Sequence, residues 1–512
     1  MDAQTYRIKL DELDKHIRGK YFIDVISCLS FDNVSKNPQY QRLTKDEWHL
    51  ILGLWYKNYS LPSSIRSEKD VEHEFHIINR LLEELHLAFL PSKEELLSGS
   101  FRRSPSFYQE SLLYEGDYAY DFQYVRFAEY KYQDDRGWLL ERKDIDTQKI
   151  LSFYLDIRRT IIAQTNCFKK DKLSNIGLTN YLCINIPKLV DNDKAYIGLI
   201  NAFSYNPPKN EKVSYNRLDQ ISPSMERPML RINDEILYVP VHRLLAQSLY
   251  ELPFFWISSD REYFKRQGKI HRGSAGEIIT EKILCGIFND EEVFHNIEIL
   301  SGKNNVSEID NLVIYEGTAI IIQVKSKRIT LDSRQGNIKR IEDDYQKAIK
   351  EAFSQAKKCE NAIVSRQCTF KPSKLTDLIK TINDIICICI TLDPIPGKDN
   401  MTRMFSELQE ERPIVMSVFE LDIITHFLNK MEFIKYLKFR INSNNQIIGN
   451  NEADYLENYL FTPNLPQLLS EYNMIQAQPA NHIDTIMNKK LLEKYIPDYK
   501  ALLSIPPKNI LE

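Results

Sequence analysis

One stretch of this chain, residues 308–327, most constrains what it can fold into; it reads E-I-D-N-L-V-I-Y-E-G-T-A-I-I-I-Q-V-K-S-K. It predicts two apolar strands joined by a two-residue turn at Glu316 and Gly317, because glycine tolerates the positive φ angle that such turns need. The apolar runs predict strands that are buried on both faces, as strands are in α/β proteins. We therefore expect an α/β core around this hairpin.

Polar residues gather at the open end of the same hairpin. If the two residues that flank the turn pair with each other, Asp310 lies opposite Gln323, and Glu308 lies opposite Lys325. Because side chains alternate between faces along a strand, all four polar groups then point the same way. Burying such a cluster costs free energy unless its members are paired or bind an ion. The open end of the hairpin is therefore where we expect the chemistry.

These residues resemble the PD-(D/E)xK nuclease superfamily in its Q-x-K form, the branch of Mrr-like and NERD-like restriction endonucleases. In that family a helix supplies a Glu, a hairpin supplies an Asp, and the next strand supplies Glu or Gln and then Lys. The matching residues are Glu277 in R-G-S-A-G-E, Asp310, and the Gln323 and Lys325 of Q-V-K. The resemblance covers roughly residues 258–395.

The resemblance implies metal-assisted phosphodiester hydrolysis, with Asp310, Gln323 and Lys325 as the catalytic residues. Asp310, Glu277 and the backbone carbonyl beside Gln323 would hold Mg²⁺ or Mn²⁺, since hard cations take oxygen ligands. The ion would polarise the phosphoryl oxygen and lower the pKa of a bound water. Lys325 would orient that water and offset charge in the transition state. Gln323, in place of the commoner acid, removes one negative charge and predicts weaker metal binding or a single ion.

Simpler interpretations of the same residues stay open. Ser274 and Glu277 form the S-x-x-E pattern of a capping box at a helix start, and Glu281, one turn later, is then the substitute carboxylate. Asp310 and Lys325 also fit a cross-strand salt bridge at the rim of a sheet. A buried glutamine often only satisfies backbone groups. It is the convergence of these residues that favours a site.

Basic residues follow the hairpin directly. The segment from residue 325 to residue 374 has 13 basic and 6 acidic residues, a local net charge of +7 in a chain of net charge −4. Those nearest the expected site are predicted to bind DNA phosphates, which gives affinity and register without sequence information; they are Lys327, Arg328, Arg334, Lys339 and Arg340. The alternative is a solvated helix face, partly neutralised by neighbouring acids. Glu308 and Gln355 are expected beside the site, and Gln355 resembles an auxiliary glutamine of some relatives.

The order of elements predicts an α/β protein with a mixed-sheet, restriction-endonuclease-like core. We expect this nuclease-like domain over residues 236–430. An α-rich or α+β region of recognition or regulatory role is expected over residues 1–235, and a helical extension over residues 431–512.

Individual elements are predicted by their periodicity. Apolar residues at three- and four-residue steps over 69–90 predict a long helix that Pro91 ends. A second long helix is expected over 338–364. The alternating aromatic residues of 118–124 predict a strand with one aromatic face, able to stack bases or to pack.

Composition and missing motifs exclude several classes. The 43% hydrophobic content is typical of soluble globular proteins. A polar N-terminus predicts no signal peptide, and no apolar run approaches the length that spans a bilayer, so we expect a cytoplasmic protein without a membrane partner. The eight cysteines include no C-x-x-C pair, which argues against structural zinc. The absence of G-x-x-x-x-G-K-[ST] predicts no ATP site in this chain.

The sequence therefore predicts a cytoplasmic, Mg²⁺- or Mn²⁺-dependent DNA endonuclease. Family analogy suggests restriction-like, anti-phage defence as its setting. DNA is the expected partner, together with a second copy of the chain or a defence-system protein. The alternatives are a catalytically silent nucleic-acid-binding or regulatory protein that keeps the nuclease fold, and a repair or RNA nuclease.

Overall fold

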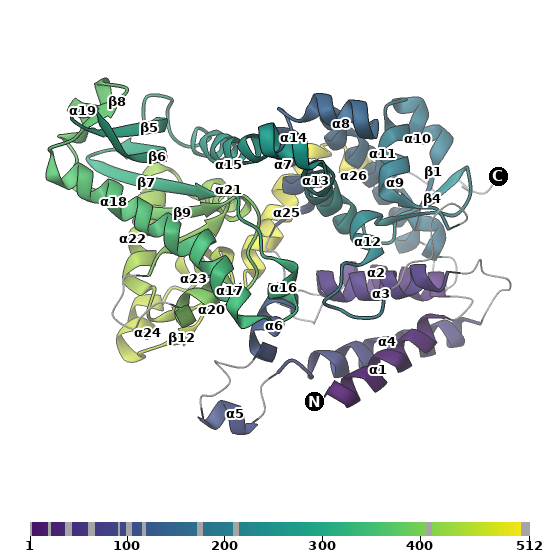
Figure 1. Cartoon of the computed structure of the whole chain (residues 1–512). Helices are drawn as coiled ribbons and strands as arrows, with labels where there is room; N and C mark the ends of the chain where they lie inside the picture. The colour runs from purple at the N-terminus through teal and green to yellow at the C-terminus, as the bar shows by residue number, and fades with distance from the viewer. Residues whose placement is uncertain are drawn as a thin grey trace. The chain divides into compact units, whose positions relative to one another are not determined.

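The computed structural model describes residues 3–18, 22–35, 43–59, 67–90, 93–98, 105–114, 119–170, 178–207, 215–405 and 412–502. The chain divides into two units (Figure 1). The first comprises Met1–Gly116, Tyr120–Phe264 and Asn488–Glu512, and the second comprises Asp117–Ala119 and Lys265–Met487. The domain boundaries that the sequence suggests near residues 235 and 430 stay a prediction.

A six-stranded sheet lies at the centre of the second unit, with the strand order β10-β9-β7-β6-β5-β8. β7, β9 and β10 pair in parallel, whereas β6, β5 and β8 are joined by antiparallel pairing. The strands span Val293–Ser301 (β5), Asn304–Tyr315 (β6), Thr318–Lys325 (β7), Thr369–Lys371 (β8), Asp384–Thr391 (β9) and Ile414–Ser417 (β10). The mixed sheet confirms the predicted fold class, although the short edge strand β8 was not among the expected strands.

The hairpin of β6 and β7 has the predicted turn and register. Tyr315 pairs with Thr318, and the ladder continues to the pair of Asn311 with Ile322. Glu316 and Gly317 between them have φ angles of 46° and 76°, the positive values of a type I′ turn. The interior residues of β7 are buried, as expected for a strand that is covered on both faces.

Helices cover both faces of the sheet. On one face, Ile309 of β6 and Ile321 of β7 share a core with Ala356 of α18. On the other face, Gly276 of α15 lies so close to Val324 that an added Cβ would be 2.8 Å from the valine Cγ1. Glycine thus lets α15 approach the strand that ends at the expected site.

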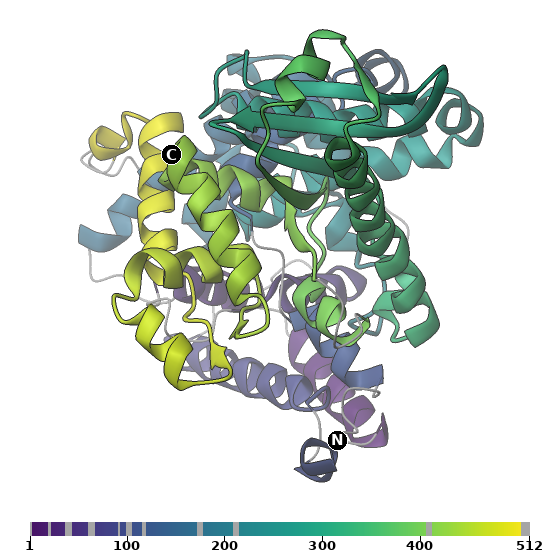
Figure 2. The same ribbon diagram turned by 90° about the vertical axis from the view of Figure 1, so that its left-hand side faces the viewer.

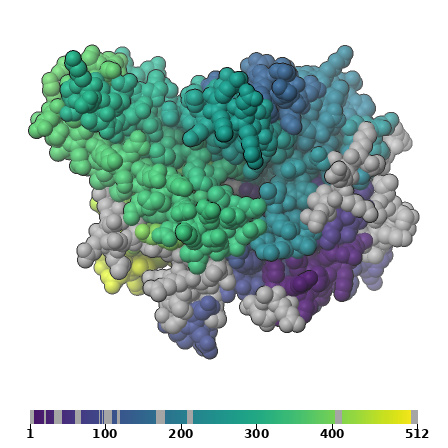
Figure 3. Space-filling view, viewed as in Figure 1, coloured from purple at the N-terminus to yellow at the C-terminus, as the bar shows by residue number. Residues whose placement is uncertain are grey.

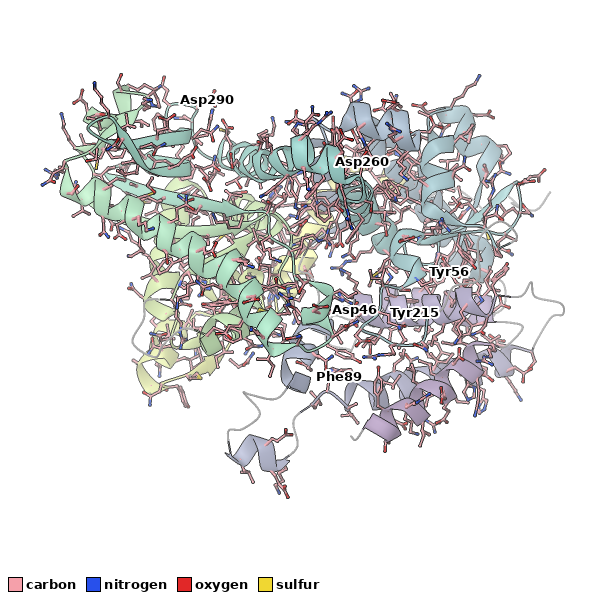
Figure 4. All side chains as sticks on the ribbon, in the orientation of Figure 1. Asp46, Tyr56, Phe89, Tyr215, Asp260 and Asp290 are labelled. Carbon is pink, nitrogen blue, oxygen red and sulfur yellow. The ribbon has the colours of Figure 1, made fainter. Side chains whose placement is uncertain are left out.

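One long helix precedes β5, and a long helical run over residues 338–365 follows β7. The predicted helix over 338–364 is confirmed as one run with a π-helical turn in its middle, which Figure 2 shows extending beyond the sheet; its second part, α18, packs on β7 and β9. Asp290 lies on the turn between α15 and β5 (Figure 4). The bounds are Phe264–Gly268 (a first π-turn), Lys269–Leu284 (α15), Leu331–Arg334 (α16), Ile338–Tyr345 (α17), Gln346–Lys350 (the second π-turn), Glu351–Ser365 (α18) and Lys374–Ile379 (α19).

Buried ion pairs hold together the helices that follow β9. Lys398 pairs with Glu420, and the Arg440 guanidinium makes bonds of 2.6 and 3.1 Å to Glu452. The backbone N–H of Glu452 donates to Glu420 at 2.8 Å, so the two pairs form one network. The elements are Lys398–Phe405 (α20), Val418–Phe427 (α21), Lys430–Ser443 (α22), Ile447–Ile448 (β11), Glu452–Phe461 (α23), Leu465–Glu471 (α24) and Ile475–Gln476 (β12). This part of the chain confirms the predicted helical C-terminal region.

The first unit is mostly helical and contains a small sheet of order β1-β4-β3-β2, which confirms an α+β region. Its strands are Cys183–Asn185 (β1), Ser204–Tyr205 (β2), Met229–Arg231 (β3) and Ile236–Tyr238 (β4). Its larger helices are Ala3–Ile17 (α1), Phe22–Ser35 (α2), Lys45–Lys57 (α3), Glu68–His86 (α4), Pro105–Tyr114 (α6), Asp121–Lys131 (α7), Arg136–Lys143 (α8), Ile150–Lys170 (α9), Tyr196–Phe203 (α11) and His242–Ser259 (α13). The shorter helical segments are Lys93–Ser98 (α5), Thr147–Lys149, Leu178–Leu182, Ile186–Asn192 (α10), Pro223–Glu226 (α12), Arg261–Tyr263 (α14) and Tyr499–Leu502 (α26), and α25 spans Asn481–Tyr495.

Two local predictions for the first unit have opposite outcomes. The helix expected over 69–90 is confirmed by α4, although this helix ends at His86 and not at Pro91. The aromatic strand expected over 118–124 is wrong, because residues from Asp121 onwards form α7; Tyr118 lies outside the described residues. Phe122, Tyr124 and Val125 are all buried, so this helix is apolar on several sides and its alternating aromatics carry no strand signal. None of the helices in the described ranges is long and apolar enough to cross a membrane.

Candidate active site

Backbone pairing between the two strands of the hairpin ends just before Asp310. Beyond this point, side chains of one strand make hydrogen bonds to the backbone of the other. Asp310 Oδ2 accepts the backbone N–H of Val324 at 2.7 Å. Gln323 Nε2 donates to the backbone carbonyl of Glu308 at 2.8 Å. The ladder therefore ends one pair before Asp310 and Gln323, and the predicted polar residues lie where β6 leaves β7.

Gln323 is fully buried, and only one end of its amide is satisfied. Its Nε2 also lies 3.8 Å from Sγ of Cys359 on α18, whereas its Oε1 has no hydrogen-bond partner among the described residues. Reversing the amide would set two oxygens against each other at the Glu308 carbonyl, so the unsatisfied atom is the oxygen. Because an unpaired buried acceptor costs about 1–3 kcal/mol, this oxygen marks a place for a donor, a water or a cation.

Lys325, at the end of β7, reaches α18 instead of Asp310. Its Nζ donates to Oε1 of Gln355 at 3.0 Å, so Gln355 stands beside the site as predicted. No ion pair joins Asp310 to Lys325 within the residues that the structure describes. The simple cross-strand salt bridge, left open by the sequence, is therefore not what these two residues form.

Glu277 lies in the middle of α15 and does not cap it. The helix begins at Lys269, and Ser274 Oγ donates to the carbonyl of Ile270, so the capping-box interpretation is wrong. Glu281, the substitute carboxylate, lies 2.9 Å from His295 of β5 and is engaged there. Glu277 is thus the carboxylate of this helix that interacts electrostatically with Asp310 and Lys325.

The carboxylates repel one another electrostatically. Burial, with the charges of Asp310 and Glu308, raises the pKa of Glu277 to about 7, and Lys325 opposes the rise. Burial also raises the pKa of Asp310, against the bond from Val324 N–H and the charge of Lys325. Glu308 itself is exposed. Raised pKa values of two half-buried acids that repel each other are typical of functional sites.

The five basic residues predicted to bind DNA differ in their surroundings. Lys327 Nζ lies 2.6 Å from buried Asp344, and Arg328 lies 3.9 Å from Asp393. Arg340 is exposed and lies between two acids at 3.5 and 3.6 Å. The remaining two are half-buried Arg334 and exposed Lys339, and residues 338–345 contribute to the green surface in Figure 3. Lys327 therefore forms an ion pair within the protein, whereas the side chains of Lys339 and Arg340 are exposed to solvent.

Comparison with known proteins addresses this segment directly. Residues 272–387 match the family model of the nuclease-related domain, NERD. This segment is therefore similar to a nuclease-related domain. No curated protein and no solved structure matches the chain. The matched residues include Glu277, the hairpin, and the helix of Gln355, so the candidate site lies wholly inside the matched segment.

The donors in the nuclease-related domain suit a hard divalent cation. Asp310 uses only Oδ2 for Val324, which leaves Oδ1 without a hydrogen bond in the described residues, and Gln323 Oε1 is unsatisfied. No group of three or more His, Cys, Asp and Glu side chains that could hold a metal lies within the described ranges. An ion would therefore rest on one or two carboxylates with amide or backbone oxygens and water, as Mg²⁺ commonly does.

Two residues near the site were missed from the sequence. Cys359, one turn after Gln355, touches Gln323, and its Sγ donates to the Glu308 carbonyl at 3.4 Å. Arg272 of α15 binds the backbone directly after Lys325. The spacing of Cys359 from Gln355 on a helix was a usable signal, but the contact of Arg272 depends on the approach of α15 to β7.

Proposed function

We propose that the nuclease-related domain hydrolyses phosphodiester bonds of DNA as an endonuclease that depends on Mg²⁺ or Mn²⁺. The observation that supports this proposal is the meeting of Asp310, Gln323 and Lys325 where β6 leaves β7, with Glu277 electrostatically coupled to Asp310. A purely structural cluster would pair these groups with one another. Here Oε1 of buried Gln323 and Oδ1 of Asp310 instead have no hydrogen-bond partner among the described residues.

Each residue has a distinct role in the proposed reaction. A bound ion would polarise a phosphoryl oxygen and lower the pKa of a water. Asp310, fixed by Val324 N–H, presents its free oxygen to the ion, and Glu277 adds a second carboxylate. Gln355 holds the Lys325 ammonium at 3.0 Å, where it orients the attacking water and offsets charge as the phosphate becomes pentavalent.

DNA is proposed as the substrate because basic residues follow the hairpin directly in the sequence. Lys339 and Arg340 are exposed on α17, which follows the strand that carries Lys325. Phosphate contacts from such residues supply affinity without base specificity. Restriction-like defence is the setting that the family analogy favours.

A nicking assay with matched variants tests the proposal. Supercoiled plasmid, linear duplex, single-stranded DNA and RNA would each be incubated with the purified chain in Mg²⁺, Mn²⁺ or EDTA. Asp310→Asn keeps an oxygen for Val324 N–H but removes the charge, so we expect loss of cleavage with an unfolding temperature no lower than that of the wild type. Glu281→Gln, on the same helix as Glu277 but facing His295, is the control and should cleave normally.

Two outcomes would contradict the proposal. Cleavage that persists in the Asp310→Asn variant would place the chemistry elsewhere, and cleavage that is indifferent to EDTA would remove the metal from the mechanism. Cleavage of RNA but not DNA would keep the chemistry and change the substrate.

A catalytically silent nucleic-acid-binding protein is the second candidate, and Gln323 favours it. This position lacks the acid that would be a further hard ligand, and the described residues offer no group of three acidic, His or Cys ligands. In that case the chain would bind DNA, with or without a metal ion, but would leave every substrate intact.

A further inference from the structure

Arg272 joins the helix that carries Glu277 to the strand that carries Lys325. It lies on α15, five residues before Glu277, and its side chain is 9% exposed. Its Nε and Nη2 both donate to the backbone carbonyl of Ser326, at 3.0 and 2.7 Å. Ser326 directly follows Lys325, so the guanidinium binds the backbone one residue after the lysine of the candidate site.

A buried aspartate holds the guanidinium in this orientation. Arg272 Nη2 also donates to Oδ2 of Asp393, which lies two residues beyond the end of β9. The backbone N–H of Leu392 donates to the Lys325 carbonyl at 2.9 Å. The start of α15, the end of β7 and the end of β9 are therefore tied together at one point. A buried guanidinium is stable there because it is both paired and hydrogen-bonded.

We propose that Arg272 is a positioning residue that sets the distance between the Glu277 carboxylate and the Lys325 ammonium, with Asp393 orienting it. This inference rests on the proposed nuclease function. The two charged groups lie on different elements, and the backbone of α15 already approaches β7 closely at Gly276. The planar fork of arginine suits this task, since it directs several N–H groups in fixed directions. Because it is almost wholly buried, Arg272 acts on the site and not on DNA.

The competing explanation is that Arg272 and Asp393 merely stabilise the fold as a buried ion pair. The same unit contains such a pair away from the hairpin: Arg440 and Glu452 are 1% and 0% exposed and make bonds of 2.6 and 3.1 Å. Arg440→Lys is therefore the matched control for Arg272→Lys. Each change keeps the charge and removes the fork.

The experiment compares these two variants, with Arg272→Gln as a third, in four measurements. These are the unfolding temperature, amide hydrogen exchange of residues 326–330, Mn²⁺ affinity by titration, and the single-turnover nicking rate with the protein in saturating excess over plasmid. We expect both lysine variants to lose similar thermal stability. Only the Arg272 variants should exchange faster at 326–330, bind Mn²⁺ more weakly and nick more slowly.

The loss of nicking rate should be larger for Arg272→Gln than for Arg272→Lys, and the affinity for DNA should not change in either variant. Arg272→Gln should slow the nicking step by about 100-fold, the cost of a misplacement of about 1 Å. Arg272→Lys should lose less, because an ammonium still reaches Asp393 or Ser326 but not both in the same geometry. If the glutamine variant does not fold, the lysine variant still decides the question.

The results separate failure of this inference from failure of the proposed function. If Arg272→Lys and Arg440→Lys lose Mn²⁺ affinity and rate in equal proportion, Arg272 is only a stabilising residue. If the wild-type chain neither binds Mn²⁺ nor nicks DNA, the proposed function fails and the catalytic part of the inference fails with it. Exchange at residues 326–330 then still shows whether Arg272 joins the two elements.

Discussion

Replacing Glu277 by glutamine should stabilise the metal-free protein above neutral pH. The pKa of Glu277 is about 7 in the folded chain against an ordinary value of 4.5, because of burial and of the charges of Asp310 and Glu308. Between these two pH values the folded state keeps a proton that the unfolded state has lost. Folding stability therefore falls as the pH rises from 4.5 to 7, and the loss is complete above pH 7.

The magnitude follows from the size of this pKa difference. About 2.5 pH units, at about 1.4 kcal/mol for each unit, amount to about 3–4 kcal/mol of lost stability. Glutamine has no charge to bury, so Glu277→Gln should be more stable than wild type by up to this amount at pH 8 and nearly equal to it at pH 4. In a unit of this size each kcal/mol shifts the unfolding temperature by roughly 2–4 °C.

Thermal unfolding in EDTA at pH 4, 6 and 8 measures the effect, with Glu281→Gln as the control on the same helix. Added Mn²⁺ should reverse the order at pH 8, because metal binding favours the ionised carboxylate and stabilises the wild type. Parallel pH profiles for wild type and Glu277→Gln would refute the argument. So would a control variant that shows the same gain.

Three further changes give separate expectations. Lys325→Ala should slow nicking by about 10²–10³-fold, the usual cost of losing one donor to developing charge, while filter binding shows unchanged affinity for DNA. Gln323→Glu should raise Mg²⁺ affinity in a calorimetric titration by adding a hard oxygen ligand, but it should lower metal-free stability, since a carboxylate cannot donate to the Glu308 carbonyl; weaker Mg²⁺ binding would contradict this. Ile321→Ala, at a fully buried position between the sheet and α18, should cost about 2–5 kcal/mol in urea unfolding, and a loss below 1 kcal/mol would show that the core collapses around the cavity.

The central part of the fold could be predicted from local sequence patterns. The turn at Glu316 and Gly317 and the pairing of Tyr315 with Thr318 were predictable because a positive-φ turn of two residues fixes the register of its hairpin. The helices and strands around it were predictable for a different reason, since each element has its own hydrophobic periodicity. The aromatic strand was not, because α7 is buried on several sides and loses the contrast on which periodicity depends.

The composition of the site also came from the sequence, but its electrostatics did not. The spacing of Asp310, Gln323 and Lys325 on two paired strands places them together in any fold that keeps the hairpin. Whether Glu277 caps its helix or joins the site was open, and the answer depends on where α15 begins. The same helix start decides that Glu281 meets His295 and not the site.

The sequence by itself determined the hairpin, its register and the residue types at its open end, because these depend on neighbours within about 20 positions. Only the tertiary structure decided how those residues are used. Lys325 donates a hydrogen bond to Gln355, and Arg272 on another helix donates to the Ser326 carbonyl. Such contacts join residues that are far apart in the chain, and their formation depends on the close packing of α15 and α18 on opposite faces of the sheet, which no local pattern specifies.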